Sequence, residues 1–306
     1  MTDSKTAFVK RLSQDQPLLL DGGIATQLEA QDCDINHVLW SASLLQTNPD
    51  AIVTAHEAYL RAGAECIGTA SYQASYEGFA SLGLSTKQAD EMMRLSIRLA
   101  SNANKAGHAM IAASIGPYGA MLADGSEYRG NYDVDRSTLV GFHQSRLKLF
   151  DLSAADVLAV ETIPSLEEAE VLAELLAECT TPSWVSFSCK DESNICDGHS
   201  IAEAAAIFNN HPKVVAVGIN CTPPQYAVSL IKKIRQVLPE KHIIAYPNSG
   251  EIYNASTNSW SGTVSPEDCS LAAIEWINAG AKIVGGCCRM GPKHIAAIKT
   301  AIAKND

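Results

Sequence analysis

Three cysteines in the last third of the chain have the residue type and placement that chemistry would need. Cys287 and Cys288 follow a short apolar run that ends in two glycines, and Cys221 follows a similar apolar run upstream. Both runs are typical of buried strands that carry cysteine at their carboxyl ends. If the three thiols converge, they form a soft-metal site that leaves one coordination position open.

The chemistry of such a site depends on what the thiols hold. Three thiolates suit Zn²⁺, and a fourth position left to water or substrate is typical of a catalytic zinc. The residues alone leave two other interpretations open. The thiols could be buried and inert, or the adjacent pair Cys287 and Cys288 could be redox-active, because the spacing is not that of a standard C-x-x-C site.

Short apolar runs alternate with longer helical segments along the whole chain. The runs are mostly continuous, as in parallel strands whose two faces are both buried. Eight such units predict an α/β fold, a closed (β/α)8 TIM barrel in a single domain over residues 1–306. An open doubly wound sheet is the alternative, but the chain has neither a G-x-G-x-x-G nor a Walker-type loop. The predicted strands are 18–20, 65–71, 109–115, 157–161, 184–188, 214–219, 243–246 and 282–286.

A barrel would bring the cysteines together, because all its strands end on one face. Cys221 ends the sixth predicted strand, and Cys287 and Cys288 end the eighth, with one strand between them. The longest irregular segments, 116–135, 191–200 and 248–265, also follow strands. We therefore expect them on the carboxyl-terminal face, where the active sites of TIM barrels lie.

Composition excludes several classes of function. The 306 residues carry a net charge of −11, so neither a nucleic-acid footprint nor a polybasic membrane patch is expected. No apolar run reaches about 18 residues, the length of a membrane-spanning helix. The polar amino terminus lacks the apolar core of a signal peptide. We therefore expect a cytoplasmic protein whose nine cysteines are reduced.

The cysteine motifs resemble those of a known family. Gly-Ile-Asn-Cys at 218–221 and Gly-Gly-Cys-Cys at 285–288 are similar to the zinc motifs of the homocysteine S-methyltransferases. That family includes betaine–homocysteine methyltransferase and the homocysteine domain of cobalamin-dependent methionine synthase. The resemblance covers nearly the whole chain, and the further matching segments are Leu20 to Gly23 with Thr26, Thr69 to Gln73, Glu161 with Thr162, and Tyr246 to Gly250. Gly23 stands where alanine is common in the family.

The resemblance implies a reaction and a cofactor. It implies Zn²⁺ held by Cys221, Cys287 and Cys288, and transfer of a methyl group to the thiol of L-homocysteine to form methionine. Residues 116–130 are closest to the branch that uses S-methylmethionine. A sulfonium donor is therefore expected, S-methylmethionine or S-adenosylmethionine, and betaine is the alternative.

The other strand-end residues receive expected roles from the same resemblance. Glu161 is expected to hold the amino group of homocysteine, although a structural ion pair would also explain a carboxylate there. Asp21 would hold the substrate ammonium or the cationic end of the donor. Backbone and hydroxyl groups would bind the substrate carboxylate, and Asn220 would orient the metal ligands. The complete set of expected substrate-binding residues is Asp21, Gly22, Gly23, Thr26, Ser71, Glu161, Asn220 and Asn248.

Three hypotheses of different classes follow. The first is a zinc-dependent homocysteine S-methyltransferase acting on small molecules, with no nucleic acid, membrane or obligate protein partner. The second is a thiol-redox barrel enzyme in which Cys287 and Cys288 cycle between thiols and a disulfide. The third is a non-catalytic barrel that stores zinc or acts in an assembly. Zinc content separates the first from the second, and turnover with homocysteine separates the first from the third.

Overall fold

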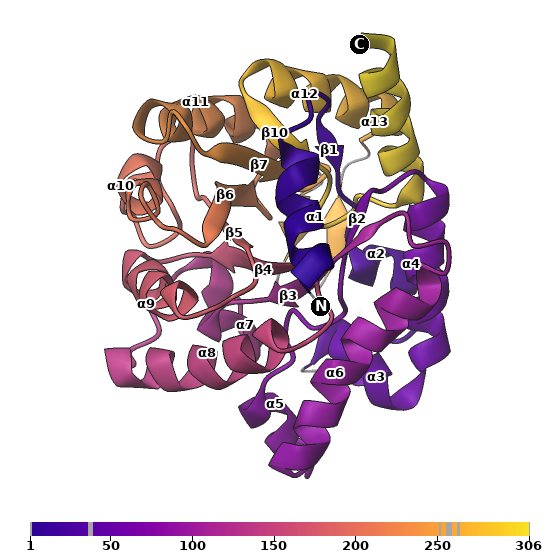
Figure 1. Cartoon of the computed structure of the whole chain (residues 1–306), viewed down its shortest axis with the longest axis vertical. Coiled ribbons are helices and arrows are strands. Elements are labelled where there is room, and N and C mark those ends of the chain that lie inside the picture. Colours follow the sequence, from indigo (N-terminus) through magenta and orange to yellow (C-terminus); the bar gives the residue numbers. More distant parts are fainter. Residues whose placement is uncertain (1, 36–38, 251, 255–258, 262–263, 306) are drawn as a thin grey trace.

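Eight parallel strands form the centre of the molecule in a computed structural model that describes residues 2–35, 39–250, 252–254, 259–261 and 264–305 (Figure 1). The strands are hydrogen-bonded in the order β1-β10-β7-β6-β5-β4-β3-β2. A parallel bridge between Leu20 and Cys66 joins the two outermost strands, which closes the barrel. The bounds are β1 (Leu18–Leu19), β2 (Cys66–Gly68), β3 (Met110–Ile115), β4 (Val157–Ile163), β5 (Ser183–Phe187), β6 (Val214–Asn220), β7 (His242–Tyr246) and β10 (Ala281–Val284).

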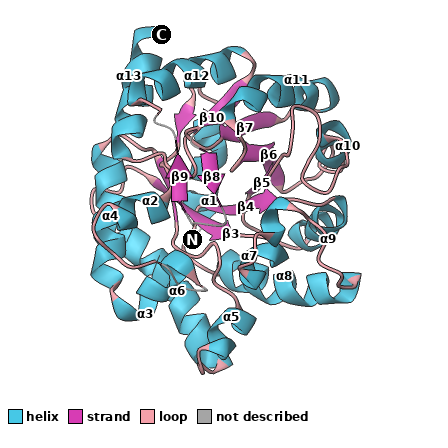
Figure 2. Ribbon diagram, turned by 180° about the vertical axis from the view of Figure 1, so that it is seen from behind, coloured by secondary structure: helices cyan, strands magenta, loops and turns pink. Residues whose placement is uncertain are grey.

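The predicted barrel is therefore confirmed, and each predicted strand overlaps an observed one. Helices surround the strands on the outside (Figures 1 and 2). The longer helices, of eleven residues or more, are α1 (Thr2–Leu12), α4 (Pro49–Arg61), α6 (Thr86–Ala103), α8 (Arg136–Asp151), α9 (Leu166–Ala177), α11 (Ala227–Val237), α12 (Pro266–Asn278) and α13 (Pro292–Asn305). The shorter ones are α2 (Ile24–Glu29), α3 (Leu44–Thr47), α5 (Tyr76–Ser81), α7 (Tyr118–Leu122), α10 (Ile201–Ala206) and the 3₁₀ turns η1 (Trp40–Ser43), η2 (Ser126–Tyr128) and η3 (Pro224–Tyr226).

Helix α1 closes the amino-terminal end of the barrel, a feature that strand and helix patterns did not predict. Its Phe8 and Leu12 are buried and belong to the apolar cluster inside the barrel, whereas Val9 is 46% exposed. The Phe8 ring lies 5.9 Å from the ring of Trp184 on β5, centroid to centroid. Figure 1 shows α1 lying across the barrel. The amino-terminal end of the barrel is thus filled by side chains of α1, so a substrate would enter from the carboxyl-terminal end.

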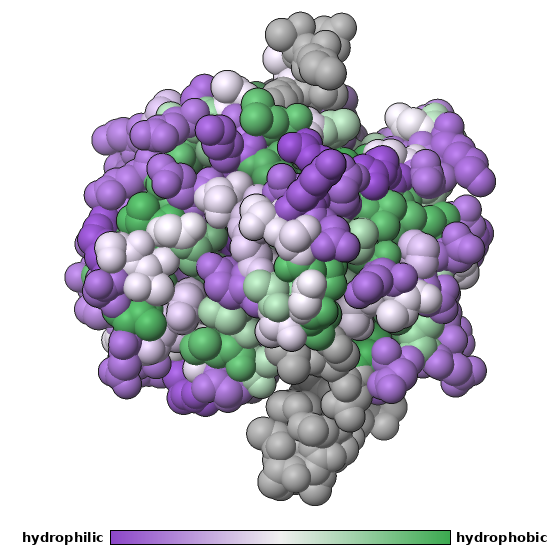
Figure 3. Space-filling model, turned by 90° about the horizontal axis from the view of Figure 1, so that it is seen from below, coloured by the Kyte–Doolittle hydropathy of each residue, from purple (hydrophilic) through white to green (hydrophobic). Residues whose placement is uncertain are grey.

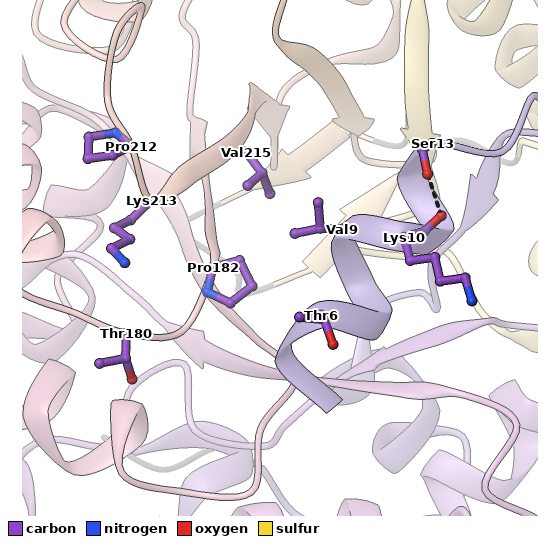
Figure 4. Close-up of a pocket in the computed structure, with 9 residues that line it drawn as sticks. All are labelled: Thr6, Val9, Lys10, Ser13, Thr180, Pro182, Pro212, Lys213 and Val215. Atoms are coloured by element: carbon purple, nitrogen blue, oxygen red, sulfur yellow. Dashed lines mark hydrogen bonds between the residues drawn. The ribbon is translucent and has the colours of Figure 1, made fainter. Parts of the chain in front are cut away.

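A groove runs between α1 and the amino ends of β5 and β6 (Figure 4). It is on the face opposite the carboxyl ends of the strands. The residues that line it are Thr6, Val9, Lys10, Ser13, Thr180, Pro182, Pro212, Lys213 and Val215.

The predicted long segments after the strands do lie at the carboxyl-terminal end. Segment 248–265 carries an antiparallel pair, β8 (Ile252–Asn254) and β9 (Ser259–Ser261), which Figure 2 shows in front of the barrel; part of this segment lies outside the described residues. In the space-filling view of Figure 3, hydrophilic and hydrophobic residues are interspersed. Within the described ranges, no helix has the length and apolarity to cross a membrane.

Candidate metal centre and active site

The three predicted cysteines meet at the carboxyl ends of β6 and β10. The sulfur atoms of Cys221, Cys287 and Cys288 all lie within 4.8 Å of one another, a spacing that could hold a metal ion. The sulfurs of Cys221 and Cys288 are 3.8 Å apart. The barrel therefore brings together thiols that are distant in sequence, as the strand pattern predicted.

Backbone hydrogen bonds to residues that follow β7 and β1 fix the turn that carries Cys287 and Cys288. The Cys287 N–H donates to the Pro247 carbonyl (2.9 Å), and the Ser249 N–H donates to the Cys288 carbonyl (3.1 Å). The Gly286 N–H donates to the Asp21 carbonyl (3.1 Å). The end of β10 is thus tied to the ends of β7 and β1, which limits the positions of both sulfurs.

Asn220 holds the other half of the cluster. Its carboxamide oxygen accepts from the Thr162 N–H (2.7 Å), and its Nδ2 donates to the Thr162 hydroxyl (2.7 Å). Thr162 has φ 62° and Cys221 has φ 45°, left-handed conformations that side chains other than glycine rarely adopt. Asn220 Nδ2 also reaches the Cys287 sulfur at 4.0 Å. Strained backbone at the ends of β4 and β6, which are separated by β5, is typical of a functional site.

Cys221 and Cys287 form a disulfide in the structure, with their Cα atoms 5.5 Å apart. The expectation of reduced thiols throughout is wrong for this pair and holds for the seven other cysteines. The redox hypothesis had instead paired Cys287 with Cys288, and in the structure Cys288 is a free thiol. A disulfide and a metal would compete for the same sulfur atoms, so metal binding requires the reduced pair.

The Cys288 thiol is poorly ionised without a nearby cation. Burial raises its pKa to about 12, and the charges of Glu127 and Glu29 add to the effect. A bound divalent cation would instead lower the pKa of the Cys288 thiol, because it stabilises the thiolate directly.

Two half-buried carboxyl groups, Asp21 and Glu161, lie at the same strand-end face as the cysteines. Asp21 Oδ2 accepts from the Gly68 N–H (2.8 Å). Burial raises the pKa of Asp21 well above its usual value, the Gly68 hydrogen bond opposes this, and the charge of Glu161 raises it further. Burial also raises the pKa of Glu161. Two mutually repelling carboxylates at one strand-end face are suited to bind a shared cation.

Glu161 is held by groups that the sequence did not identify. The Tyr246 hydroxyl donates to Glu161 Oε2 (2.9 Å), and the Ser114 hydroxyl donates to Oε1. The Trp184 indole N–H in turn donates to the Tyr246 hydroxyl (3.1 Å). These bonds lower the pKa of Glu161 against the effect of burial. No motif marked Ser114 or Trp184, because their roles arise from inward-facing positions on neighbouring strands.

The predicted glycines pack against the cysteine turn. A Cβ on Gly22 would lie 1.9 Å from the Met290 carbonyl oxygen, and one on Gly23 would lie 2.6 Å from the Cys287 carbonyl oxygen. The Gly23 N–H already donates to the Met290 carbonyl (3.1 Å), so it is not free for the expected bond to a substrate carboxylate. Thr26 Oγ1 accepts from the Arg289 N–H (3.0 Å) and keeps its own hydrogen for another acceptor.

Ser71 and Asn248, two further predicted substrate-binding residues, differ in whether their polar groups already form hydrogen bonds. The Ser71 hydroxyl is fully buried and donates to the Ser114 carbonyl (2.7 Å), so its hydrogen is used between β2 and β3. The Asn248 carboxamide oxygen is buried and has no hydrogen-bond partner within the described residues. Asn248 is therefore the better placed of the two to bind a substrate group.

Glu168 and its partners anchor segment 116–135 over this end of the barrel. The carboxylate accepts from the Tyr118 N–H (2.6 Å) and the Tyr132 hydroxyl (2.9 Å), and lies 2.8 Å from His143 Nε2. A capping box at the start of α9 is therefore only half formed. Ser165 caps the Glu168 N–H, but the Glu168 side chain is used elsewhere. The Tyr118 ring packs edge-on against Phe142, which is a structural role.

Comparison with known proteins identifies the family. A family model described as homocysteine S-methyltransferase matches residues 18–302. The homocysteine S-methyltransferase YbgG of Bacillus subtilis is 44% identical over 303 residues, which cover 95% of this chain and 96% of that protein. A selenocysteine Se-methyltransferase of Brassica oleracea is 42% identical over 302 residues, covering 92% of this chain and 87% of that protein.

A solved structure agrees in fold. The metallated form of the homocysteine methyltransferase MmuM of Escherichia coli superposes with a TM-score of 0.85 at 38% identity, covering 97% of this chain and 99% of that one. An oxidized form of MmuM superposes with a TM-score of 0.86 at 37% identity, covering 98% and 99%. With the match in sequence extending over nearly the whole chain, this barrel belongs to the homocysteine S-methyltransferase family of enzymes.

Proposed function

We propose that this enzyme transfers a methyl group from a sulfonium donor, S-methylmethionine, to the thiol of L-homocysteine at a zinc ion held by Cys221, Cys287 and Cys288. The observation that carries the proposal is the convergence of three sulfurs within 4.8 Å at the mouth of the barrel. We also propose that the whole chain acts as one homocysteine-binding barrel on small molecules in the cytoplasm, without an obligate protein partner, where reducing conditions keep the thiols available.

The donor set fits zinc. Three sulfur ligands and one open position match the preferences of a soft-binding, four-coordinate Zn²⁺. A free thiol has a pKa of about 8.5. The bound ion would lower the pKa of a thiol in the open position, so that homocysteine could react as a thiolate. Asn220 supports the set by its contacts to Thr162 and to the Cys287 sulfur.

Asp21 and Glu161 are assigned to the substrate ammonium. Both carboxyl groups have pKa values raised by burial, and an arriving cation relieves both their repulsion and their desolvation. Tyr246 and Ser114 fix the Glu161 oxygens by hydrogen bonds, so the ammonium would meet a preset acceptor. Thr26, Gly22 and Asn248 remain candidates for the substrate carboxylate and the donor. Gly23 and Ser71 are assigned a structural role, because both already form hydrogen bonds within the protein.

The methyl transfer balances without a further reactant. Homocysteine releases its thiol proton to solvent, and its sulfur forms a bond to the methyl carbon. The carbon–sulfonium bond breaks, and its electron pair stays on the donor sulfur. The donor leaves as a neutral thioether, so S-methylmethionine gives one methionine and homocysteine gives another. A positive charge on the donor and a negative charge on the acceptor sulfur are both lost in the transition state, which a water-poor site favours.

The donor is tested by kcat/KM at saturating homocysteine with zinc-replete, reduced enzyme. S-Methylmethionine, S-adenosylmethionine and betaine are compared. We expect S-methylmethionine to exceed betaine, because a sulfonium leaves as a neutral thioether and residues 116–130 resemble the sulfonium-using branch. Equal or faster turnover with betaine would overturn the donor assignment. Thiol–disulfide exchange without any methylation would favour the redox hypothesis instead.

A further inference from the structure

The segment that follows β3 brings Glu127 to the carboxyl-terminal end of the barrel. Within it, the Ser188 hydroxyl at the end of β5 donates to the backbone carbonyl of Glu127 (3.0 Å), which ties η2 to the strand ends. A Cβ on Gly119 would lie 2.5 Å from the Glu127 nitrogen, so the segment is packed closely at this point. Glu127 is therefore held firmly on the carboxyl-terminal face.

The Glu127 side chain is buried, and one of its two oxygens is left without a hydrogen bond, although the charge of Arg129 opposes the effect of burial on its pKa. It is only 4% exposed, and its Oε2 makes no hydrogen bond within the described part of the chain. Burial raises its pKa to about 7. A buried carboxyl group with a free oxygen is costly, so it is expected where a ligand completes it.

Glu127 lies beside the strand end that carries the proposed substrate-binding carboxylate. The Ser188 hydroxyl that contacts the Glu127 carbonyl also lies within hydrogen-bond distance of the carbonyl of Thr162 (3.4 Å), the residue that follows Glu161. The Tyr72 hydroxyl is also buried and has no hydrogen-bond partner among the described residues. Two unpaired polar groups from separate loops thus lie at the carboxyl-terminal end of the barrel.

Glu127 differs from the two carboxyl groups already assigned. Both oxygens of Glu161 are occupied by Tyr246 and Ser114, and Asp21 accepts from Gly68. Homocysteine carries one ammonium group, which Asp21 and Glu161 would satisfy. A cationic donor brings further positive charge, and Glu127 is the buried carboxylate left to meet it.

We propose that Glu127 is the counter-ion for the positive charge of the methyl donor, and that it selects small sulfonium amino acids over neutral thioethers. This assignment rests on the proposed function. It predicts that a change at Glu127 alters the KM of the donor and leaves the KM of homocysteine unchanged. It also gives a physical reason for product release: once the methyl group has moved, the donor is neutral and loses its attraction to this carboxylate.

The test compares Glu127→Gln with wild type in reduced, zinc-loaded enzyme. Loss of a charged hydrogen bond is worth about 10- to 150-fold, so KM for S-methylmethionine and for S-adenosylmethionine should rise by about that factor. KM for homocysteine and the zinc content should stay unchanged. The matched control is Asp133→Asn, which removes an exposed carboxylate of the same segment whose φ of 51° asparagine also tolerates. Its KM values should equal those of wild type.

Two further measurements guard against a folding defect. Glu127→Asp keeps the charge and should hold the donor KM near that of wild type. In wild-type enzyme, methionine should compete with S-methylmethionine only at a concentration at least about tenfold above the donor KM, given the same charged-bond energy. The assignment would be overturned if Glu127→Gln raised the KM values of both substrates equally or left the donor KM unchanged. It would also be overturned if methionine competed as well as the donor does. Absence of turnover with any sulfonium in wild type would instead overturn the proposed function.

Discussion

Asn220 connects the two halves of the site at the scale of single residues. One carboxamide holds Thr162 in its left-handed conformation beside Glu161 and also reaches the Cys287 sulfur. The substrate-binding and metal-binding residues are thus not independent, because they share one support. Sequence motifs placed Asn220 next to Cys221, but its partner Thr162, two strands away in the sheet, became visible only in the fold.

Removing any one cysteine ligand should abolish zinc binding. In reduced protein, Cys221→Ser, Cys287→Ser and Cys288→Ser should each fall from about one zinc per chain to near none, because two thiolates do not make a structural or catalytic zinc site. Metal analysis after gel filtration measures this, with Cys33→Ser, a half-buried free cysteine, as the control. Full occupancy in any of the three variants would remove that residue from the ligand set.

Replacing Glu161 by glutamine should weaken homocysteine binding without loss of metal. The amide keeps the size and can accept from one of the two hydroxyls, Tyr246 or Ser114, while its NH2 group donates to the other, but it loses the charge that faces the substrate ammonium. KM for homocysteine should rise about 10- to 150-fold, the range for a charged hydrogen bond. Steady-state kinetics at saturating donor measures it. An unchanged KM would return Glu161 to a structural role.

At the scale of elements, the loop after β1 and the turn after β10 are packed backbone to backbone. Gly22 leaves no room for a side chain, since a Cβ there would overlap the Met290 carbonyl. We expect Gly22→Ala to lower the free energy of unfolding by more than about 1 kcal/mol and to reduce zinc affinity. Urea denaturation and zinc titration measure the two effects.

The contrasting variant is Gly141→Ala on the exposed surface of α8. Nothing lies within 4 Å of a Cβ at this position. Because alanine favours a helix over glycine by about 0.5–1 kcal/mol, this variant should be more stable than wild type. A gain in stability for Gly22→Ala, or a loss for Gly141→Ala, would contradict the packing seen here.

The elements that could be predicted from sequence are those with a strong local signal. Continuous apolar runs marked all eight barrel strands, and the cysteines at two of their ends predicted the cluster. What could not be predicted depends on contacts between distant segments. The roles of Tyr246, Trp184 and Ser114 come from facing positions inside the barrel, and the role of Glu127 comes from a loop that folds inward. The disulfide between Cys221 and Cys287 has no local signal either.

At the scale of the whole molecule, the barrel is closed at one end by α1 and carries its chemistry at the other. Phe8 is fully buried inside the barrel, whereas its neighbour Val9 is 46% exposed. Phe8→Ala should lower the free energy of unfolding by about 3–5 kcal/mol, and Val9→Ala should change it by less than about 0.5 kcal/mol. Denaturant unfolding of both variants measures the difference. Similar values for the two would show that α1 does not pack as described.

The distance between α1 and the cysteines also separates stability from function. Phe8 lies at the amino-terminal end, and the three sulfurs lie at the carboxyl ends of β6 and β10. Phe8→Ala protein that remains folded at low temperature should therefore keep the wild-type KM for homocysteine. Kinetics below the unfolding transition measures this, and a changed KM would indicate coupling between the two ends.

The central claim is that methyl transfer to homocysteine depends on one zinc held by the three cysteines. The direct measurement is methionine formation from homocysteine and S-methylmethionine by reduced, metal-stripped enzyme during stepwise addition of zinc. The account predicts almost no activity without metal, and a linear rise that stops at about one zinc per chain, the stoichiometry of a single three-thiolate site. Full activity in the reduced, metal-free enzyme would contradict it.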